Sequence, residues 1–441
     1  MTDERRPDSL GCYGSSWAHT PNPDGLAAEG VLVQAADAPS PARTSLLTGN
    51  IPSGTGVFHH QQRLPARARM LTWAFEEAGY QTASFAKKHH FLPCKRQAFQ
   101  VEVGRVTDEF VSAAAFHADY DPATYDVLQY PDLPAREIRR RWVLGGKFPA
   151  PRDRTAEAEN VSLALSWLDK RDRYRPFFLR LSLNAPHTPV VVPPEFLSLV
   201  DPERISLLLP RAQDLADKPA RERVHLQDFQ GALCLSADQI RKLQHYYYAR
   251  AAFLDAESGR LLTWMRRRDL LSNTIVVFVS DHGTHLGDPA LLQKQTFYEL
   301  GVTVPWLLWW RGWSSRGRRH TSPVSTNGIL STLAALAGVR TGWRCEAEPL
   351  MDAGGRLSAA GAVFSEIKFG YPGYQDDDRQ VMVRSGRWKL SQFLDGDPDG
   401  APYDLEEDLE EKINLYARRP RVAAQLAVMI HSWELSRCKA T

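Results

Sequence analysis

The chain has 441 residues, of which 43% are hydrophobic and 24% charged, as in an average globular protein. Lysine and arginine number 54 against 52 acidic residues, and this balance gives no reason to expect nucleic acid as a partner. No apolar run approaches the roughly 18 residues that cross a bilayer, so we expect no membrane span. The five cysteines form no Cys-x-x-Cys pair, and the sequence therefore gives no sign of a structural zinc site.

Helical patterns alternate with short apolar runs through most of the chain. Three helix–strand pairs are predicted: 71–78 with 82–85, 156–170 with 176–183, and 235–267 with 274–280. Such alternation is typical of an α/β fold with a central, mostly parallel sheet sandwiched between helices. Residues 196–232, which carry mixed charges and two prolines, read as an insertion or surface excursion.

The pattern changes after Gly342. Three short strands, separated by glycine and aspartate turns, are predicted at 380–384, 388–393 and 401–405. One helix follows them, at 420–435. This order is typical of a small antiparallel α+β unit. We therefore predict a large α/β domain at 1–342 and a C-terminal α+β subdomain at 343–441.

Polar residues that could carry chemistry follow the predicted strands, at the sheet edge where α/β proteins collect functional groups. The candidates are Lys87 and His89 after 82–85, His187 after 176–183, Asp281 and His282 after 274–280, and Lys294 in a further loop. Lys87 and His89 alternate, so in an extended chain both point to one side and can grip a tetrahedral anion. Taken singly, each of these strings also fits an ordinary solvated loop.

Taken together and in this order, the strings resemble the sulfatase family of the alkaline phosphatase superfamily. The strongest match is Ser40 to Gly49, Ser-Pro-Ala-Arg-Thr-Ser-Leu-Leu-Thr-Gly, which is similar to the second half of the family signature. Five further strings resemble segments of the family. Met1 to Gly14 is similar to the first metal loop, and Ser280 to Gly283 to the second. Lys87-Lys88-His89 is similar to the Lys-x-His anion site, Asn184 to Pro189 to the Ala-Pro-His loop, and Gly386 to Leu390 to a strand of the C-terminal domain. The resemblance implies the alkaline phosphatase-like α/β fold.

The resemblance also implies a chemistry. In the family a signature cysteine or serine becomes formylglycine, whose hydrate attacks the sulfur of a sulfate ester, and a divalent cation, most often Ca²⁺, polarises the sulfate. Carried over to this sequence, the metal ligands are Asp3, Glu4, Asp281 and His282. Arg43 holds the nucleophile, and the sulfate oxygens contact Lys87, His89, His187 and Lys294. The implied partner is a sulfated small molecule or glycan.

The sequence departs from this pattern at the nucleophile. Counting back from Arg43, the reactive position falls on Pro39, which has no nucleophilic atom and cannot become formylglycine. Ser40 is one residue out of register and is a weak substitute. A second alignment treats the stretch 36–41 as shortened by a deletion that removed the cysteine, and the sequence does not choose between substitution and deletion.

Smaller departures also occur. Glu4 stands where Asp is frequent, Ala86 where Gly is usual, and Asp288-Pro289-Ala290 replaces an acidic-His-Gly string. The hydrophobic first strand that precedes the metal loop in the family is missing before Asp3, so we expect a sheet that lacks one strand. The compartment stays open: cytoplasmic as written, exported if a signal peptide precedes this start.

Three functions therefore remain in view. The first is a sulfuric ester hydrolase whose recorded chain is altered. The second is a catalytically silent, sulfatase-like binding protein, a possible pseudoenzyme. The third is a phosphate or phosphonate ester hydrolase of the same superfamily.

Overall fold

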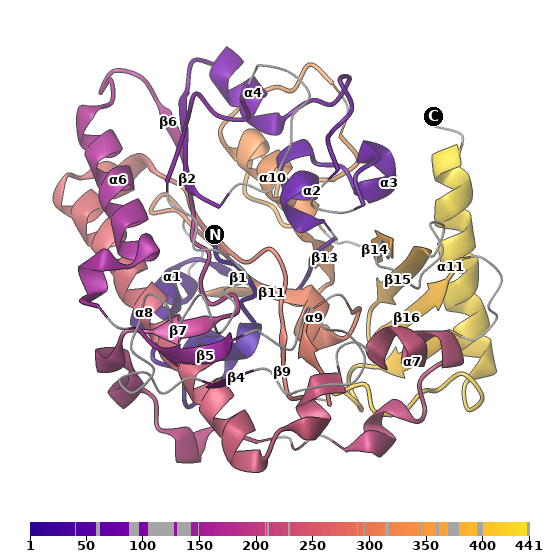
Figure 1. Ribbon diagram of the computed structural model, residues 1–441. Coiled ribbons are helices and arrows are strands. Elements are labelled where there is room, and N and C mark those ends of the chain that lie inside the picture. Colours follow the sequence, from indigo (N-terminus) through magenta and orange to yellow (C-terminus); the bar gives the residue numbers. More distant parts are fainter. Residues whose placement is uncertain are drawn as a thin grey trace.

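The structure is a computed structural model of the chain. It describes residues 1–39, 41–58, 62–87, 97–104, 128–129, 143–148, 150–207, 209, 211–227, 230–288, 290–294, 296–313, 317–343, 345–358, 361–368, 379–394 and 400–438. A large α/β body is flanked on one side by a smaller sheet and the C-terminal helix, and the N-terminus lies in the middle of the body (Figure 1). Within the described part of the chain, no helix is long and apolar enough to cross a membrane.

The central sheet is built in two sections. The first has the order β12-β1-β11-β8, with β12 at Arg318–His320, β1 at Val31–Asp37, β11 at Thr303–Trp309 and β8 at Val276–Val279. A short strand, β13 (Val324–Ser325), also pairs with β1. β11 runs antiparallel to both of its neighbours, whereas β12 and β13 run parallel to β1.

The second section has the order β3-β2-β6 and is entirely parallel. Its strands are β3 (Val101–Val103), β2 (Gln81–Ala86) and β6 (Phe177–Ser182). Of the residues that the structure describes, only the first ones of the chain lie between β6 and β8. Thr2 forms a parallel bridge with Ser280, and Leu183 N donates to the Met1 carbonyl. The sheet therefore has a break where one strand was expected to be missing.

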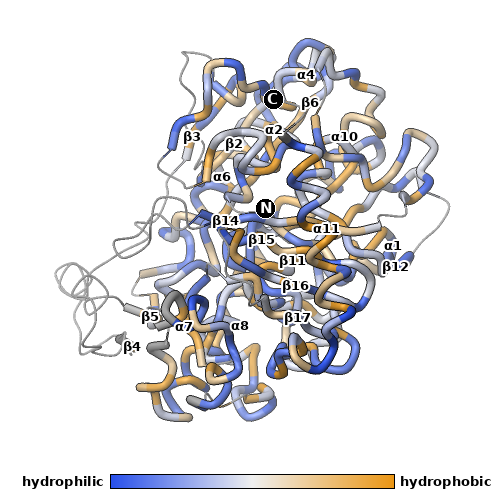
Figure 2. The backbone as a smooth tube through the Cα atoms, turned by 90° about the vertical axis from the view of Figure 1, so that its right-hand side faces the viewer, coloured by the Kyte–Doolittle hydropathy of each residue, from blue (hydrophilic) through white to orange (hydrophobic). Residues whose placement is uncertain are grey.

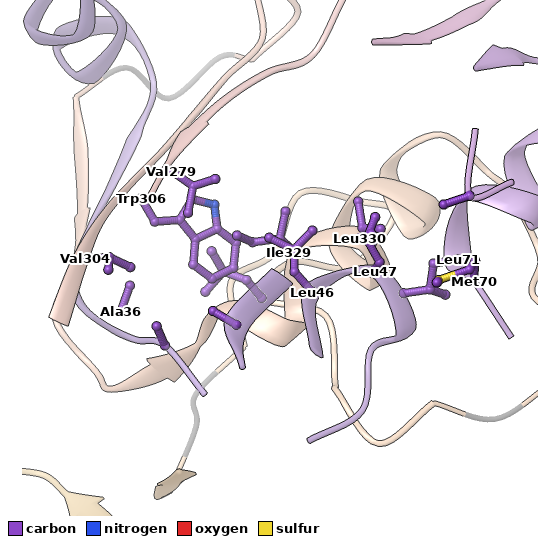
Figure 3. Close-up of a cluster of buried hydrophobic side chains, with 14 of the residues drawn as sticks. Ala36, Leu46, Leu47, Met70, Leu71, Val279, Val304, Trp306, Ile329 and Leu330 are labelled. Carbon is purple, nitrogen blue, oxygen red and sulfur yellow. The ribbon is translucent and has the colours of Figure 1, made fainter. Parts of the chain in front are cut away.

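Helices cover both faces of this sheet. On one face α2 (Ala42–Thr48), α4 (Leu71–Glu77) and α10 (Ile329–Leu336) pack with the strands, and Figure 3 shows Leu46, Leu47, Ile329 and Leu330 of this cluster extending from Trp306 of β11. On the other face lie α1 (Pro21–Glu29), α6 (Ala156–Lys170) and α8 (Ala237–Arg267). The strands between them are mostly apolar on both sides, as expected for a sheet covered on both faces, although β1 has an exposed Gln34 and β6 carries Arg180.

Capping interactions account for where the two long helices begin. The Thr155 side chain accepts a hydrogen bond from the Ala158 amide at the start of α6. At the start of α8, Ser236 and Gln239 form a reciprocal capping box. These contacts satisfy amides that have no partner within the helix.

The C-terminal sheet has the order β14-β15-β16-β17 and is antiparallel throughout. Its strands are β14 (Val363–Lys368), β15 (Arg379–Ser385), β16 (Trp388–Phe393) and β17 (Ala401–Asp404). Helix α11 (Pro420–Cys438) crosses β15 and β16, in front of them in the view of Figure 2. Smaller elements complete the fold: α3 (Pro52–Thr55), β4 (Leu128–Gln129), β5 (Val143–Lys147), β7 (Val190–Val192), α7 (Ala220–Gln227), β9 (His285–Leu286), β10 (Leu292–Gln293) and α9 (Glu299–Val302).

The predicted α/β class and the three helix–strand pairs are confirmed, and the predicted C-terminal strands and helix correspond to β15, β16, β17 and α11. The segment 196–232 is more than a surface excursion. Leu215 and Leu226 from this segment are buried against Tyr403 of β17 and Tyr298, so the segment contacts the C-terminal sheet. The domain boundary at Gly342 stays a prediction.

Candidate functional site

The predicted site residues come from chain segments that meet at the carboxyl edge of the central sheet. They are Asp3 and Glu4 beside the break in the sheet, Arg43 in the first turn of α2, Lys87 directly after β2, His187 after β6, Asp281 and His282 after β8, and Lys294 directly after β10. His89 and Ser40 lie outside the described residues. The structure brings all the others except Pro39 into direct contact with one another.

Asp3 lies at the centre of the first group of contacts. Its Oδ2 accepts from Arg43 at 3.0 Å and is 2.6 Å from the Lys87 Nζ. The Arg43 Nε donates to the Asp281 Oδ2 at 2.8 Å, so one guanidinium joins both carboxylates. His282 Nε2 lies 3.7 Å from the other Asp3 oxygen, Oδ1, and 3.8 Å from Asp281 Oδ2.

Glu4 lies at the centre of the second group. Its Oε1 is 2.8 Å from the Lys294 Nζ and 3.2 Å from the His187 Nε2. Lys294 Nζ is also 2.7 Å from His187 Nε2. The Glu4 amide donates to Asp281 Oδ1 at 3.2 Å, which connects the two groups.

Burial and charge shift the pKa values of several of these groups. Burial opposes ionisation of Asp3, but the neighbouring Lys87 and Arg43 hold the pKa of its carboxyl well below the usual value. Burial, Lys294 and Lys87 lower the pKa of His187 well below its usual value. At neutral pH the site therefore holds an ionised Asp3 and a neutral His187 imidazole.

Backbone conformation positions two of the segments. Glu4 has a φ of 57° and Ala86, just before Lys87, has a φ of 73°. Both are in the left-handed region, which costs a non-glycine residue about 1–2 kcal/mol. Glycine adopts this conformation without that cost, which agrees with the glycine that the resemblance implies at position 86. His187 is flanked by cis peptide bonds before Pro186 and Pro189.

The carboxylates and histidines are arranged so that a cation fits. Two sets offer ligand atoms within 4.8 Å of one another, Asp3 with Glu4 and His187, and Asp3 with Asp281 and His282. Asp3 is fully buried, yet its Oδ1 accepts no hydrogen bond from any described residue. A buried carboxylate oxygen without a donor is costly, and oxygen-rich donor sets suit hard cations such as Ca²⁺.

The site opens to solvent on one side. The side chains of Asp3, Glu4, Lys87 and His187 are at most 2% exposed, whereas those of His282 and Lys294 are 28% and 24% exposed. A ligand would therefore enter past His282 and Lys294. Pro39 is buried between β1 and α2, and its side chain supplies no nucleophilic atom.

Two positioning residues were not predicted from the sequence. The Ser182 hydroxyl, at the end of β6, accepts a hydrogen bond from Arg43. The Tyr247 hydroxyl, on α8, donates to the Glu4 carbonyl at 2.7 Å and accepts from the Arg6 amide at 2.9 Å. Ser182 ends a predicted strand and could have been suspected, but Tyr247 lies in a helix far along the chain and has no local signal.

The chain matches the family model described as Sulfatase over residues 1–339. It is 29% identical to an ulvan-active sulfatase of Formosa agariphila over 80% of this chain, and the match spans 63% of that relative's length. It is 28% identical to the choline-sulfatase of Rhizobium meliloti, with 87% of this chain and 73% of the relative covered. Human iduronate 2-sulfatase is 27% identical, with 78% and 69% covered.

Solved structures share the fold. A phosphonate monoester hydrolase of Agrobacterium radiobacter superposes with a TM-score of 0.82 at 22% identity, covering 99% of this chain and 94% of that one. A 2-O GAG sulfatase superposes with a TM-score of 0.76 at 19% identity, covering 100% and 91%. These likenesses show that the fold is shared along the whole chain, the C-terminal sheet included. From the family-model match over residues 1–339 we conclude that this chain belongs to the sulfatase family.

Proposed function

We propose that the site binds a divalent cation together with the sulfate group of an ester, as in a sulfuric ester hydrolase, and that turnover needs a nucleophile which Pro39 does not supply. The observation that carries the proposal is the convergence of three carboxylates with three cationic side chains around the unsatisfied Asp3 Oδ1. A site that served only to stabilise the fold would not need a carboxylate oxygen left without a donor.

In this proposal the cation is held by Asp3, Glu4, Asp281 and His282, and Ca²⁺ is the expected ion because most of the donors are carboxylate oxygens. When bound, such a cation supplies Lewis-acid polarisation of the ester oxygens. Arg43 keeps the Asp3 and Asp281 carboxylates in place through its two hydrogen bonds.

The sulfate oxygens are bound by Lys87, Lys294 and His187, with His89 as a further donor expected from the sequence. The His187 Nδ1 lies against the Thr188 carbonyl, so the proton of the neutral ring is assigned to Nδ1. Nε2 then carries the lone pair, beside Lys294 Nζ. His187 can therefore take up a proton at Nε2, on the side of the ring that faces Lys294.

Whether the protein hydrolyses the ester depends on the presence of a nucleophile. Proline cannot be converted to formylglycine, so we expect the chain as written to bind the cation and the anion without hydrolysing the ester. If the loop has instead lost a cysteine-containing piece, the natural protein is an ordinary sulfatase of this family.

The proposed substrate class is a sulfated glycan or sulfated small molecule, which the names of the ulvan-active, choline and iduronate relatives support. Phosphonate monoesters are the second class to assay, because two of the structural neighbours are phosphonate monoester hydrolases.

The test is a turnover assay with an aryl sulfate and an aryl phosphonate, using the chain as written, Pro39→Cys, and Ser40→Cys as the matched control. Each is produced with a formylglycine-generating enzyme. We expect no turnover by the chain as written, and cation-dependent turnover by Pro39→Cys alone if the loop differs by substitution. Hydrolysis by the chain as written that Ser40→Ala abolishes would contradict the proposal and make Ser40 the nucleophile.

Mass spectrometry separates the deletion from the substitution. The tryptic peptide ending at Arg43, taken from the natural source, carries extra residues with cysteine or formylglycine only if the recorded loop is incomplete. If it reads with Pro39 as written, hydrolysis by the family's route is excluded.

A further inference from the structure

A dense group of positive charges lies at the amino-terminal edge of the central sheet, whereas the candidate site lies at the carboxyl edge. It includes residues 170–175, which lead from the end of α6 toward β6, and residues 266–268, at the carboxyl end of α8. Seven of these nine residues are lysine or arginine and one is acidic, although the net charge of the whole chain is only +2. Together with Arg311, which follows β11, we call these residues the basic surface.

Two ion pairs show that the three segments of the basic surface lie side by side. The Arg268 Nη2 is 3.5 Å from the Asp169 Oδ1, which places the end of α8 against the end of α6. The Arg311 Nη1 is 3.9 Å from the Asp269 Oδ1, which places the residues after β11 against the end of α8. These four side chains are between 46% and 81% exposed, so the two pairs contribute little to stability.

Most of the charge on the basic surface is not neutralised within the protein. Lys170, Arg173, Arg266 and Arg267 are exposed, and none of them forms an ion pair with another residue that the structure describes. Burial and the neighbouring Arg173 lower the pKa of the Arg171 guanidinium, as expected where like charges lie close together. Cations in the last turn of a helix stabilise that helix, which accounts for those at the ends of α6 and α8. Arg173 lies in a loop and has no such role.

The loop at 171–175 is held in shape by its own hydrogen bonds. The Arg171 Nη1 donates to the carbonyls of Asp172 and Arg175, at 3.0 and 3.3 Å. The Tyr174 amide donates to the Asp172 Oδ1 at 2.9 Å. Tyr174 is nevertheless 99% exposed, so the loop presents an aromatic ring to solvent between two arginines.

We propose that the basic surface binds a sulfated polysaccharide and attaches the protein to it, apart from the candidate site. Arginine supplies all but one of the cations, and the guanidinium fork contacts two oxygens of a tetrahedral oxyanion at once. The exposed Tyr174 offers a sugar ring an apolar face and a hydroxyl. One exposed aromatic ring gives too little apolar area for insertion into a membrane. A net charge of +2 also gives no overall field that would steer the chain to nucleic acid.

This inference rests on the proposed function, because a polymer with many sulfate esters presents the same group to both places. The basic surface precedes β6 and β8 and the candidate site follows them. The two are therefore separated by at least the length of a strand, about 20 Å for the six residues of β6. Attachment at the basic surface would keep further sulfate esters of the same polymer at a high effective concentration around the site.

The test measures the binding of dextran sulfate to the full chain by calorimetry, with unsulfated dextran as the control ligand. A triple variant, Arg173→Gln with Arg266→Gln and Arg267→Gln, removes three exposed charges without breaking an ion pair between described residues. We expect this variant to bind dextran sulfate at least about tenfold more weakly than the unmodified chain. Added salt should weaken the binding by the unmodified chain, because exposed charges are screened.

The matched control variant removes three exposed arginines beside α11, Arg418→Gln with Arg419→Gln and Arg421→Gln. Helix α11 lies on the opposite side of the molecule from α6 and α8 (Figure 1). This variant should change the affinity for dextran sulfate by less than about twofold. Hydrogen exchange locates the polymer without any substitution: dextran sulfate should slow the exchange of the amides at 170–175 and 266–268.

An unchanged affinity of the first triple variant, or slowed exchange only outside the basic surface, would overturn the proposal. Tighter binding of duplex DNA, or of vesicles containing phosphatidylserine, than of dextran sulfate at equal ionic strength would overturn it as well. The proposed function has a separate readout, the binding of an aryl sulfate with Ca²⁺, which Lys294→Gln should weaken and the first triple variant should not. A chain that binds dextran sulfate at the basic surface but no aryl sulfate would contradict the proposed function alone.

Discussion

At the scale of single residues, buried charged and polar groups are held by specific partners, and those partners decide their protonation. Asp3 stays ionised because Lys87 and Arg43 contact the same oxygen. His285, next to the site on β9, is held between the Asp288 carbonyl and the Thr296 hydroxyl, each at 2.8 Å. Burial lowers the pKa of His285 from 6.5 to about 4.

This shift at His285 predicts a pH dependence. The pKa in the folded protein lies below that of the unfolded chain, so stability from this group is complete above pH 6.5 and is lost as the pH falls toward 4. We expect the free energy of unfolding to fall across this window, with up to about 3 kcal/mol coming from His285. Denaturant titrations at several pH values should show a smaller fall for His285→Gln. The exposed His431→Gln should keep the fall of the unmodified chain, and equal slopes in all three proteins would refute the assignment.

At the scale of elements, the backbone conformation at the end of β2 positions a residue of the site. Ala86 ends the strand with a φ of 73°, and the residue after it, Lys87, contacts Asp3. In this conformation alanine has backbone strain that glycine avoids, although glycine loses more conformational entropy on folding.

We therefore predict that Ala86→Gly costs less stability than Ala83→Gly in the same strand. Both methyl groups are buried, so the lost burial is matched. Ala83→Gly should destabilise the fold by about 1–2 kcal/mol. Ala86→Gly should be at least about 1 kcal/mol more favourable than that, because it relieves the left-handed strain. Unfolding curves in urea measure the difference, and equal losses would show that Ala86 is not strained.

At the scale of the whole molecule, a group of buried ion pairs connects the C-terminal sheet to the central body. Lys389 of β16 contacts Glu299 of α9 at 3.0 Å and Glu411 at 2.8 Å. Arg384 of β15 contacts Glu299 at 2.9 Å and Asp37 of β1 at 3.4 Å. Asp37 lies two residues before Pro39, so this network also reaches the chain segment that contains Pro39.

Removing Lys389 tests this connection. Lys389→Met leaves two buried carboxylates without their common cation, and breaking a buried pair in this way costs about 3–5 kcal/mol. The control Lys412→Met removes a surface pair with Glu410 and should cost about 0–1 kcal/mol. Thermal unfolding with limited proteolysis of the C-terminal sheet measures both. Similar small losses in the two variants would mean that the network does not hold the sheet.

The sequence predicts those parts of the fold that depend on local pattern. The helices α4, α6 and α8 and the strands that follow them were expected, and so was the gathering of Lys87, His187 and Asp281 at one edge. The reversed direction of β11 was not, because strand pairing depends on contacts between residues far apart in the chain. For the same reason, the sequence does not predict the hydrogen bond from Tyr247 to the Glu4 carbonyl or the contact of 196–232 with the C-terminal sheet.

The measurement that tests the central claim most directly is a calorimetric titration of the chain as written with Ca²⁺. Asp3→Asn removes the carboxylate shared by both ligand sets, and Asp8→Asn removes a partly exposed carboxylate that pairs with Arg6 outside them. The account predicts stoichiometric binding by the chain and by Asp8→Asn, and at least a tenfold loss (about 1.4 kcal/mol) in Asp3→Asn. No binding by the chain, or equal binding by Asp3→Asn, would contradict the proposed cation site.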